Sequence, residues 1–327
     1  MKNTPIPPPL VPRIARLFGC ATLVSMCLFG ASSGVAQTYL VNDTMTDTDR
    51  IHGANGASTS SSSPTILSTD ITSTNTQWVV NAAGQMVASS TGQLWTMNST
   101  SSRMAIGYFP LVTIGSTATM ITLNFTTGAM GATAGNLRLA LVDSRANGFR
   151  ATDAFSSTDA SYNGDVGYAV FSGSSTVGGG NTTNLSLNSY ERTTTTSTDL
   201  LGTAGNWTSL ASSSGMTGYF QANTSYALSF TLSYDAGTLS MTTALTGGNF
   251  SNASFLMTDS TNPTVDFDAL ALRFGSGSNQ FANVNLTSFT VSQASAVPEP
   301  STYAALVGAA SLGLVILRRR RAASLAA

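Results

Sequence analysis

The segment Tyr226 to Tyr234, with the sequence YALSFTLSY, alternates apolar and polar residues without interruption. Successive side chains of a β-strand point to opposite faces of its sheet, so this alternation predicts a strand with one buried face. The turn residues DAGT follow, and the alternation resumes from Leu239 to Leu245. Together the two segments predict an antiparallel β-hairpin.

Similar alternation recurs in the segments MITLNFT, NLRLALV, GYAVFSG, ALALRF and NVNLTSFTV. It predicts that the following side chains face inward: Ile121, Leu123, Phe125, Leu137, Leu139, Leu141, Leu270, Leu272 and Phe274. In NVNLTSFTV, Val284 and Leu286 share one phase, whereas Phe289 and Val291 share the opposite phase. A β-bulge near Thr287 would bring all four side chains to one face.

No segment between residues 37 and 295 shows a helical period, and turns rich in Gly, Asn and Ser separate the predicted strands. This pattern is typical of an all-β fold, here an antiparallel β-sandwich of the jelly-roll type. A parallel β-helix is the alternative, but that fold needs a fixed short repeat, which the sequence lacks. Residues 37–295 are therefore expected to form a β-sandwich body.

The first 36 residues are arranged as in a secretory signal peptide. Three basic residues, Lys2, Arg13 and Arg16, precede the apolar run CATLVSMCLFG, and small residues follow up to SGVAQ. This order predicts a signal helix that signal peptidase removes between Ala36 and Gln37; a short N-terminal anchor is the alternative. Both cysteines of the chain lie in this segment, so the body contains no disulfide.

The body is acidic and has no lysine. Residues 37–296 contain seven arginines, 13 Asp and one Glu, which gives this segment a net charge of −7. Nucleic acids bind basic surfaces, so this charge argues against a nucleic-acid partner. It is compatible with divalent cations and with neutral glycans.

The C-terminal region combines an uncharged apolar segment with a cluster of arginines. Residues 301–317 contain no charged side chain. As a helix they would span about 25 Å, against about 30 Å for the hydrocarbon core of a bilayer. The cluster that follows, Arg318, Arg319, Arg320 and Arg321, would hold this end in the cytoplasm. We therefore expect a transmembrane helix over 301–317 that leaves the body outside that membrane.

Directly before the apolar segment stand Val297, Pro298, Glu299 and Pro300. Residues 296–327, with this motif, the apolar segment and the arginines in that order, resemble the PEP-CTERM sorting signal of Gram-negative bacteria. The resemblance implies that exosortase, a membrane protein resembling a protease and acting as a transpeptidase, processes the chain at the Pro-Glu-Pro motif. The protein would then be anchored transiently in the inner membrane before it reaches the cell surface or the extracellular matrix.

Four segments of the body, TYLVNDTMTDTDR, SSRMAIGYF, FDALALRFG and FANVNLTSFTV, resemble those of uncharacterised secreted proteins of Verrucomicrobia-type bacteria. The resemblance implies a concanavalin-like or laminin-G-like jelly roll. In such folds the last strand often carries an Asp-Asn-Val motif, whereas this chain has Ala282, Asn283 and Val284. Because the aspartate is missing, the resemblance supports the fold and transfers no metal or ligand role.

The body offers few groups for catalysis: one histidine, His52, one glutamate, Glu191, and neither cysteine nor lysine. His52 lies in the polar stretch RIHGANG without a nucleophile motif, which indicates a loop residue. Asp266 and Asp268 would share one face of a strand and could in principle form a glycosidase pair, but a solvated strand face or the onset of a turn is the favoured interpretation. The sequence therefore predicts that the protein is not an enzyme, and a glycan-active hydrolase or lyase is the least favoured alternative.

Two groups of residues are candidates for ligand binding. Asp43, Asp47 and Asp49 stand close enough in sequence to bind calcium, the one cofactor that the residues suggest, or to form an exposed acidic turn. Trp207, in the loop-like AGNWTSL, is the best candidate for stacking on a sugar ring. The weaker candidates, of which the first two flank a predicted hairpin over 79–94, are Trp78, Trp95, Tyr162 and Tyr190.

The sequence thus predicts an exported, non-catalytic protein with a structural or adhesive role. Contact with extracellular polysaccharide is suggested by the PEP-CTERM resemblance and by no single residue. A lectin-like carbohydrate-binding module, with or without calcium, is the second hypothesis.

Overall fold

The computed structural model describes the body and one helix near the C terminus. The described residues are 37–46, 71–73, 76–80, 86–88, 95–98, 104–129, 137–146, 148, 150, 162–172, 185–192, 200–201, 207–213, 216–251, 253–274, 283–294 and 307–318. Gln37–Ala294 forms one compact unit, and the C-terminal helix belongs to another and is described by itself. The predicted signal segment 1–36 and the motif at 297–300 lie outside the described residues.

The regular elements in the described part of the body are strands. They are β1 (Gln37–Asp43), β2 (Gln77–Val80), β3 (Met86–Ala88), β4 (Trp95–Asn98), β5 (Met104–Thr113), β6 (Thr119–Thr127), β7 (Leu137–Asp143), β8 (Val166–Ser172), β9 (Leu187–Glu191), β10 (Thr208–Ser212), β11 (Ser225–Asp235), β12 (Thr238–Gly247), β13 (Ser254–Asp259), β14 (Asp266–Phe274) and β15 (Asn283–Ala294). The all-β class predicted from the alternation is confirmed.

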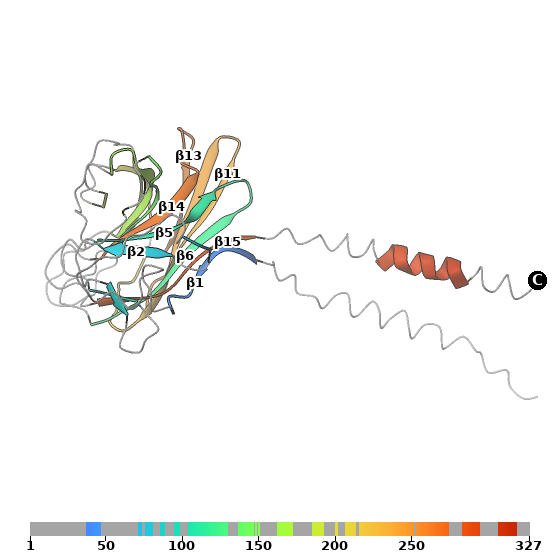
Figure 1. The fold of residues 1–327 in the computed structure, drawn as a ribbon, viewed down its shortest axis with the longest axis horizontal. Coiled ribbons are helices and arrows are strands. Elements are labelled where there is room, and N and C mark those ends of the chain that lie inside the picture. The colour runs from blue at the N-terminus through green and yellow to red at the C-terminus, as the bar shows by residue number, and fades with distance from the viewer. Residues whose placement is uncertain are drawn as a thin grey trace, which may run out of the picture. The chain divides into compact units, whose positions relative to one another are not determined.

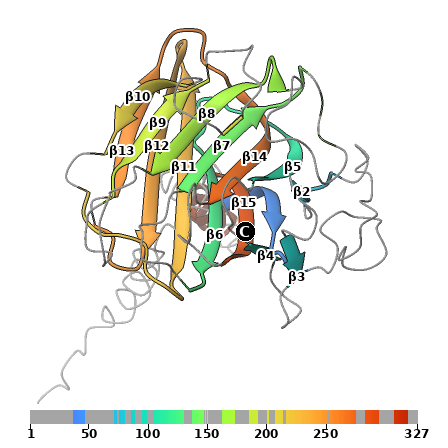
Figure 2. The same cartoon turned by 90° about the vertical axis from the view of Figure 1, so that its left-hand side faces the viewer.

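The strands form two antiparallel sheets that pack face to face (Figure 1). The eight-stranded sheet has the order β13-β12-β11-β6-β15-β4-β3, and β1 also pairs with β15. The seven-stranded sheet has the order β10-β9-β8-β7-β14-β5-β2, and Figure 2 shows most of its strands side by side. The predicted antiparallel β-sandwich is therefore confirmed.

The main core lies between the two sheets and is made of the inward positions that the alternation marks. Leu228, Phe230 and Leu232 of β11 belong to it, as do Leu139 and Leu141 of β7. Each is at most 1% exposed. Burial of a large apolar side chain contributes about 1.5–3 kcal/mol, so this layer supplies the main stabilisation of a body that contains no disulfide.

The seven-stranded sheet is buried on its other face as well, which the alternation did not predict. A second core on that face contains Ala140, Val142, Ala169 and Phe171, which alternate with residues of the main core. Side chains from outside the strands cover this face, namely Tyr162, Leu200, Leu201 and Trp207. Burial on both faces explains why LRLALV and GYAVF are nearly continuous apolar runs.

The predicted hairpin is confirmed as β11 and β12, which pair in register from Tyr226–Gly247 to Asp235–Thr238. Its two loop residues, Ala236 and Gly237, have φ of 47° and 84°. Positive φ at both central positions is the signature of a type I′ turn, whose twist matches that of the two strands.

The predicted bulge in β15 is confirmed at Thr287. Leu286 pairs with Phe125 of β6 and Ser288 pairs with the next residue, Asn124, so Thr287 is left over. The bulge returns the later part of the strand to the core, because Val284, Leu286, Phe289 and Val291 are all at most 1% exposed.

The predicted hairpin over 79–94 is wrong. Val79 and Val80 belong to β2, which pairs with β5 in the seven-stranded sheet. The hairpin partners in this region are β3 and β4, which lie in the other sheet. The apolar run at 78–80 fits burial on both faces of its sheet, and local alternation alone does not reveal that the chain crosses from one sheet to the other.

Candidate functional site

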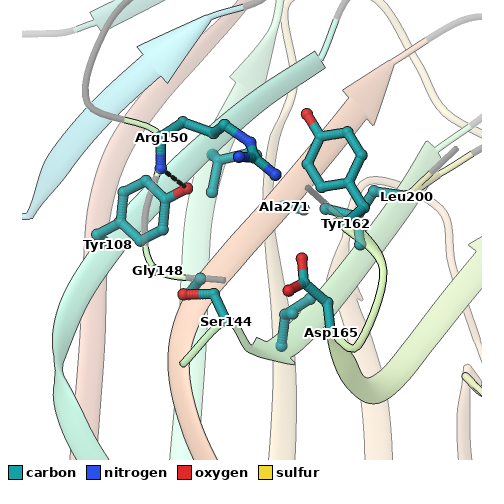
Figure 3. A pocket seen from close by; sticks show the side chains of 11 residues that line it. Tyr108, Ser144, Gly148, Arg150, Tyr162, Asp165, Leu200 and Ala271 are labelled. Atoms are coloured by element: carbon teal, nitrogen blue, oxygen red, sulfur yellow. Dashed lines mark hydrogen bonds between the residues drawn. The ribbon is translucent and has the colours of Figure 1, made fainter. Parts of the chain in front are cut away.

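A small polar cavity lies on the outer face of the seven-stranded sheet (Figure 3). β5, β7 and β14 form its floor, Arg150 follows β7, and Tyr162 and Asp165 precede β8. The described residues that line it are Ile106, Tyr108, Val142, Ser144, Gly148, Arg150, Tyr162, Asp165, Leu200, Ala269 and Ala271. Its volume of about 10 Å³ corresponds to about one water-sized group.

Asp165 is the acidic group of this cavity. The residue is only 3% exposed, and its Oδ1 has no hydrogen-bond partner among the described residues. Burial raises the pKa of this carboxyl to about 7, although the charges of Arg192 and Arg150 oppose the rise. Asp165 therefore changes its charge near neutral pH, in contrast to an ordinary aspartate.

Two arginines surround Asp165. Arg192 is 2% exposed, and its guanidinium donates hydrogen bonds to the backbone carbonyls of Asp165 and Tyr162, both at 3.0 Å. The guanidinium carbon of Arg150 lies 4.5 Å from the centre of the Tyr162 ring, a cation–π distance. The Arg150 backbone N–H donates to the Tyr108 hydroxyl at 2.7 Å, while its buried Nε has no partner among the described residues.

The carboxyl of Asp268 holds Ser144, one of the residues that line the cavity. Its Oδ1 accepts from the Ser144 N–H at 2.8 Å and its Oδ2 from the Ser144 hydroxyl at 3.0 Å. Burial raises the pKa of Asp268, and these hydrogen bonds oppose the rise.

Asp266 and Asp268 have separate partners, so the suggested glycosidase pair is not assembled. β14 shifts its register between Phe267 and Ala269, which places Asp268 at a bulge. Asp266 lies at the start of the strand and contacts Arg145 at 2.7 Å. The strict alternation that placed the two carboxylates on one face does not hold here.

We expect Asp165→Asn to stabilise the protein above neutral pH. The pKa of Asp165 is raised in the folded state, so ionisation of this carboxyl favours the unfolded state. Its contribution to the free energy of unfolding is therefore fully present below about pH 4 and is lost as the pH rises towards 7. The amide mimics the neutral carboxyl, so the variant should gain about 1–3 kcal/mol at pH 8 and almost nothing at pH 4. Chemical denaturation at the two pH values measures this difference; equal gains at both would contradict it.

One pair of neighbouring carboxyls, Glu191 and Asp259, lies at the ends of β9 and β13, which belong to different sheets. Asp259 accepts from the Tyr168 hydroxyl at 2.6 Å through Oδ2 and from the Thr261 N–H at 2.8 Å through Oδ1. Burial raises the pKa of Glu191, and the charge of Asp259 and a hydrogen bond with it raise it further. Glu191, which the sequence presented as the single glutamate of the body, therefore lies beside another carboxyl.

Glu191→Gln should stabilise the protein at pH 8 by roughly 0.5–1 kcal/mol, because it removes one of two adjacent negative charges. Because the pKa of Glu191 is raised, its contribution to the stability of the fold is present at acidic pH and is lost as the pH rises through this raised pKa. The gain should therefore vanish near pH 4. Thermal unfolding of the wild type and the variant at both pH values tests this. A variant less stable than the wild type at pH 8 would contradict a repulsion between Glu191 and Asp259.

Of the three aspartates predicted to bind calcium, only Asp43 lies among the described residues. This residue is 3% exposed, and its Oδ1 accepts from the Met45 N–H at 2.8 Å. Its Oδ2 accepts from the N–H of Thr76 at 3.0 Å and from the Thr76 hydroxyl. Asp47 and Asp49, like His52, lie outside the described residues, and within the described ranges no three His, Cys, Asp or Glu side chains group as metal ligands.

Trp207 is buried, so its predicted exposure for stacking on a sugar is wrong. It is 5% exposed, and its Nε1 donates to the Leu200 carbonyl at 3.2 Å. Phe171 packs edge-on against it, with ring centres 5.8 Å apart. The polar residues around Trp207 in sequence indicated a loop but could not reveal this long-range packing on the sheet.

The other aromatic candidates also lie within the protein where the structure describes their side chains. Trp78 and Tyr162 are each 1% exposed. Tyr190 is partly buried against Phe171, at a ring distance of 4.8 Å. The side chain of Trp95 lies outside what the structure describes.

The C-terminal helix covers residues 307–318 and ends at Arg318, the first residue of the arginine cluster. Its large apolar side chains, which are exposed, are Val307, Leu312, Leu314, Val315, Ile316 and Leu317. No helix among the residues that the structure describes is both long and apolar enough to span a membrane. Arg319, Arg320 and Arg321 lie outside the described residues.

Solved structures with a similar fold include several lectins. The VIP36 exoplasmic/lumenal domain, in its Ca²⁺/mannose-bound form, is 14% identical over 68% of this chain and 84% of its own, with a TM-score of 0.42. The metal-free Emp46p carbohydrate recognition domain is 14% identical over 66% of this chain and 87% of its own, with a TM-score of 0.41. A seed lectin of Lotus tetragonolobus is 8% identical over 65% of this chain and 91% of its own, with a TM-score of 0.38.

No curated protein sequence matches this chain. A match does occur at the C terminus, where residues 296–321 fit the PEP-CTERM protein-sorting motif. This range contains Val297 to Pro300, the apolar segment and the four arginines. The motif is a recognition signal for exosortase processing and implies export and processing at the membrane. The chain therefore carries a PEP-CTERM sorting motif at its C terminus.

Proposed function

We propose that the protein is a non-catalytic cell-surface or extracellular-matrix protein of a Gram-negative bacterium, with a structural or adhesive role. The observation that carries the proposal is the sorting motif over 296–321, which follows directly on a compact β-sandwich. A sandwich with a continuous core between its sheets is suited to a rigid role outside the cell, where it needs neither cofactor nor disulfide.

In this proposal the chain is processed at both ends. Signal peptidase cleaves between Ala36 and Gln37, and residues 301–317 hold the chain in the inner membrane until exosortase acts at Val297 to Pro300. The exposed apolar side chains of the C-terminal helix support the membrane step, because a helix that is apolar all round requires an apolar environment. The arginine cluster keeps the end in the cytoplasm, and the prolines keep the motif extended and accessible.

The proposal of a non-catalytic body is supported by the roles of its carboxylates. Several of them hold turns and strand ends through hydrogen bonds or ion pairs: Asp43, Asp143, Asp259, Asp266 and Asp268. Carboxylates held in this way are unsuited to act as a glycosidase acid and nucleophile.

The second candidate function is that of a carbohydrate-binding module, with polysaccharide as the extracellular partner. The observation that favours it is the polar cavity, where a buried donor and a buried acceptor lack partners among the described residues. Calcium remains part of this candidate through Asp43, Asp47 and Asp49.

Cell fractionation tests the main proposal. We expect the protein in the medium or the matrix of wild-type cells and in the inner membrane of cells that lack exosortase. Replacing Arg318 to Arg321 by serine should weaken the membrane step, whereas the conservative change to lysine should preserve it. Equal distribution of the protein in cells with and without exosortase would contradict the proposal.

A further inference from the structure

We propose that the cavity beside Asp165 binds one hydroxyl group of a neutral polyol, such as the hydroxymethyl group of a sugar. The proposal rests on the second candidate function, carbohydrate binding, and gives it a site and a ligand chemistry. None of the residues predicted from the sequence to bind a ligand lines this cavity, apart from Tyr162.

The first argument is a pair of polar atoms without partners. Asp165 Oδ1 and Arg150 Nε are both buried and have no hydrogen-bond partner among the described residues. Both residues line the cavity, and Figure 3 shows their side chains extending into it. Buried polar atoms are nearly always paired, so an acceptor and a donor left open in one cavity indicate a missing group that pairs with both.

The chemistry of the missing group follows from these two atoms. A hydroxyl can accept from Arg150 Nε and donate to Asp165 Oδ1 at once. A cation is disfavoured because the charges of Arg150 and Arg192 both act on Asp165, and an anion is disfavoured by the Asp165 carboxylate itself. A neutral group that both donates and accepts is therefore the best match.

The size and the walls of the cavity restrict the ligand further. The cavity has room for about one water-sized group, which fits one hydroxyl and excludes a whole sugar ring. Ile106, Val142, Ala269 and Ala271 give the floor of the cavity an apolar surface that suits the methylene carbon carrying that hydroxyl. Two other polar groups of the cavity are already engaged, since the Ser144 hydroxyl donates to Asp268 and the Tyr108 hydroxyl accepts from the Arg150 N–H.

The site should respond to pH because the ligand donates to the ionised carboxylate. The charged groups that act on Asp165 are Arg192 and Arg150, which favour ionisation, and Asp268 and Asp143, which oppose it. With the pKa of Asp165 near 7, the carboxylate is largely formed at pH 8.5 and largely protonated at pH 5.5. Affinity should therefore rise by about tenfold between these pH values.

Saturation-transfer NMR on the protein isolated from its own cells tests this site, with D-glucose and 6-deoxy-D-glucose as probes. The second probe lacks the hydroxyl of the hydroxymethyl group. At pH 8.5 we expect D-glucose to bind about tenfold more tightly than its deoxy analogue. Asp165→Asn and Arg150→Gln should each reduce the binding of D-glucose about tenfold, and the first should also abolish its pH dependence.

Asp235→Asn is the matched control, because Asp235 is an exposed aspartate at the end of β11, in the other sheet. Thermal unfolding of every variant checks that the fold is retained. Equal binding of the two sugars, or unchanged binding in Asp165→Asn, would overturn the site.

Retention on polysaccharide separates failure of the site from failure of the second function. If the wild type and Asp165→Asn are retained equally, glycan binding occurs elsewhere on the protein. If the wild type binds neither sugar nor polysaccharide, the second function itself fails, and the cavity holds a water molecule.

Discussion

Deleting Thr287 should unfold the body or leave it barely stable. This residue is the extra one at the bulge of β15, so its loss shifts one half of the strand by one position against β6. A shift of one residue turns every side chain to the opposite face. Either Val284 and Leu286 or Phe289 and Val291 would leave the core, at a cost of about 3–6 kcal/mol for two large apolar side chains.

That loss is comparable with the whole stability of an ordinary domain, about 5–15 kcal/mol. It would also disrupt the contact between Phe109 and Phe289, whose ring centres lie 5.2 Å apart. Urea denaturation measures the effect, and Thr287→Ser, which keeps the residue count, should stay within about 0.5 kcal/mol of the wild type. A deletion variant as stable as the wild type would show that the bulge does not hold the register.

Replacing Pro298, Glu299 and Pro300 by alanine should block the release of the protein. The sorting motif at 296–321 identifies this region as the signal for exosortase processing. Without the two prolines, the residues before the apolar segment can also continue its helix. Exosortase would then meet a helical segment in place of an extended one. We expect the processed form to fall at least about tenfold in pulse-chase labelling, and the precursor to accumulate in the membrane fraction.

Ser295→Ala is a suitable control for this experiment, since Ser295 lies just before the matched range and outside the motif. It should be processed like the wild type. Normal processing of the triple variant would mean that the enzyme recognises another part of the tail.

Local patterning accounts for much of the fold. Alternation in β11 and β12 identified the hairpin and its buried face, and the change of phase between Leu286 and Phe289 located the bulge. Alternation has this power because the side-chain period of a strand is two, so a single extra residue is visible in the sequence. It also identified the strand face that packs against the other sheet.

What local patterning missed depends on contacts between distant residues. The second core was not visible because Tyr162, Leu200 and Trp207 cover the outer face of the seven-stranded sheet from outside its strands. For the same reason, the polar surroundings of Trp207 in sequence suggested exposure, whereas Phe171 and the Leu200 carbonyl hold the indole inside.

The polar cavity was likewise beyond the reach of sequence reasoning. Tyr108, Arg150 and Asp165 are separated by 42 and 15 residues, and no motif links them. The raised pKa of Asp165 arises mainly from its burial, which is a property of the folded chain. Asp165 lies in the turn-like NGD just before a strand, which indicates a turn and gives no sign of an acidic group inside a cavity.

Mapping the C terminus of the protein isolated from its own cells tests the central claim most directly. Mass spectrometry of the extracellular or surface-bound form should find peptides of the body up to Ala294 and no peptide from residues 301–327. Both the sorting motif and the proposed temporary span require this loss. Residues 301–327 still attached to the extracellular protein would contradict exosortase processing and the function built on it.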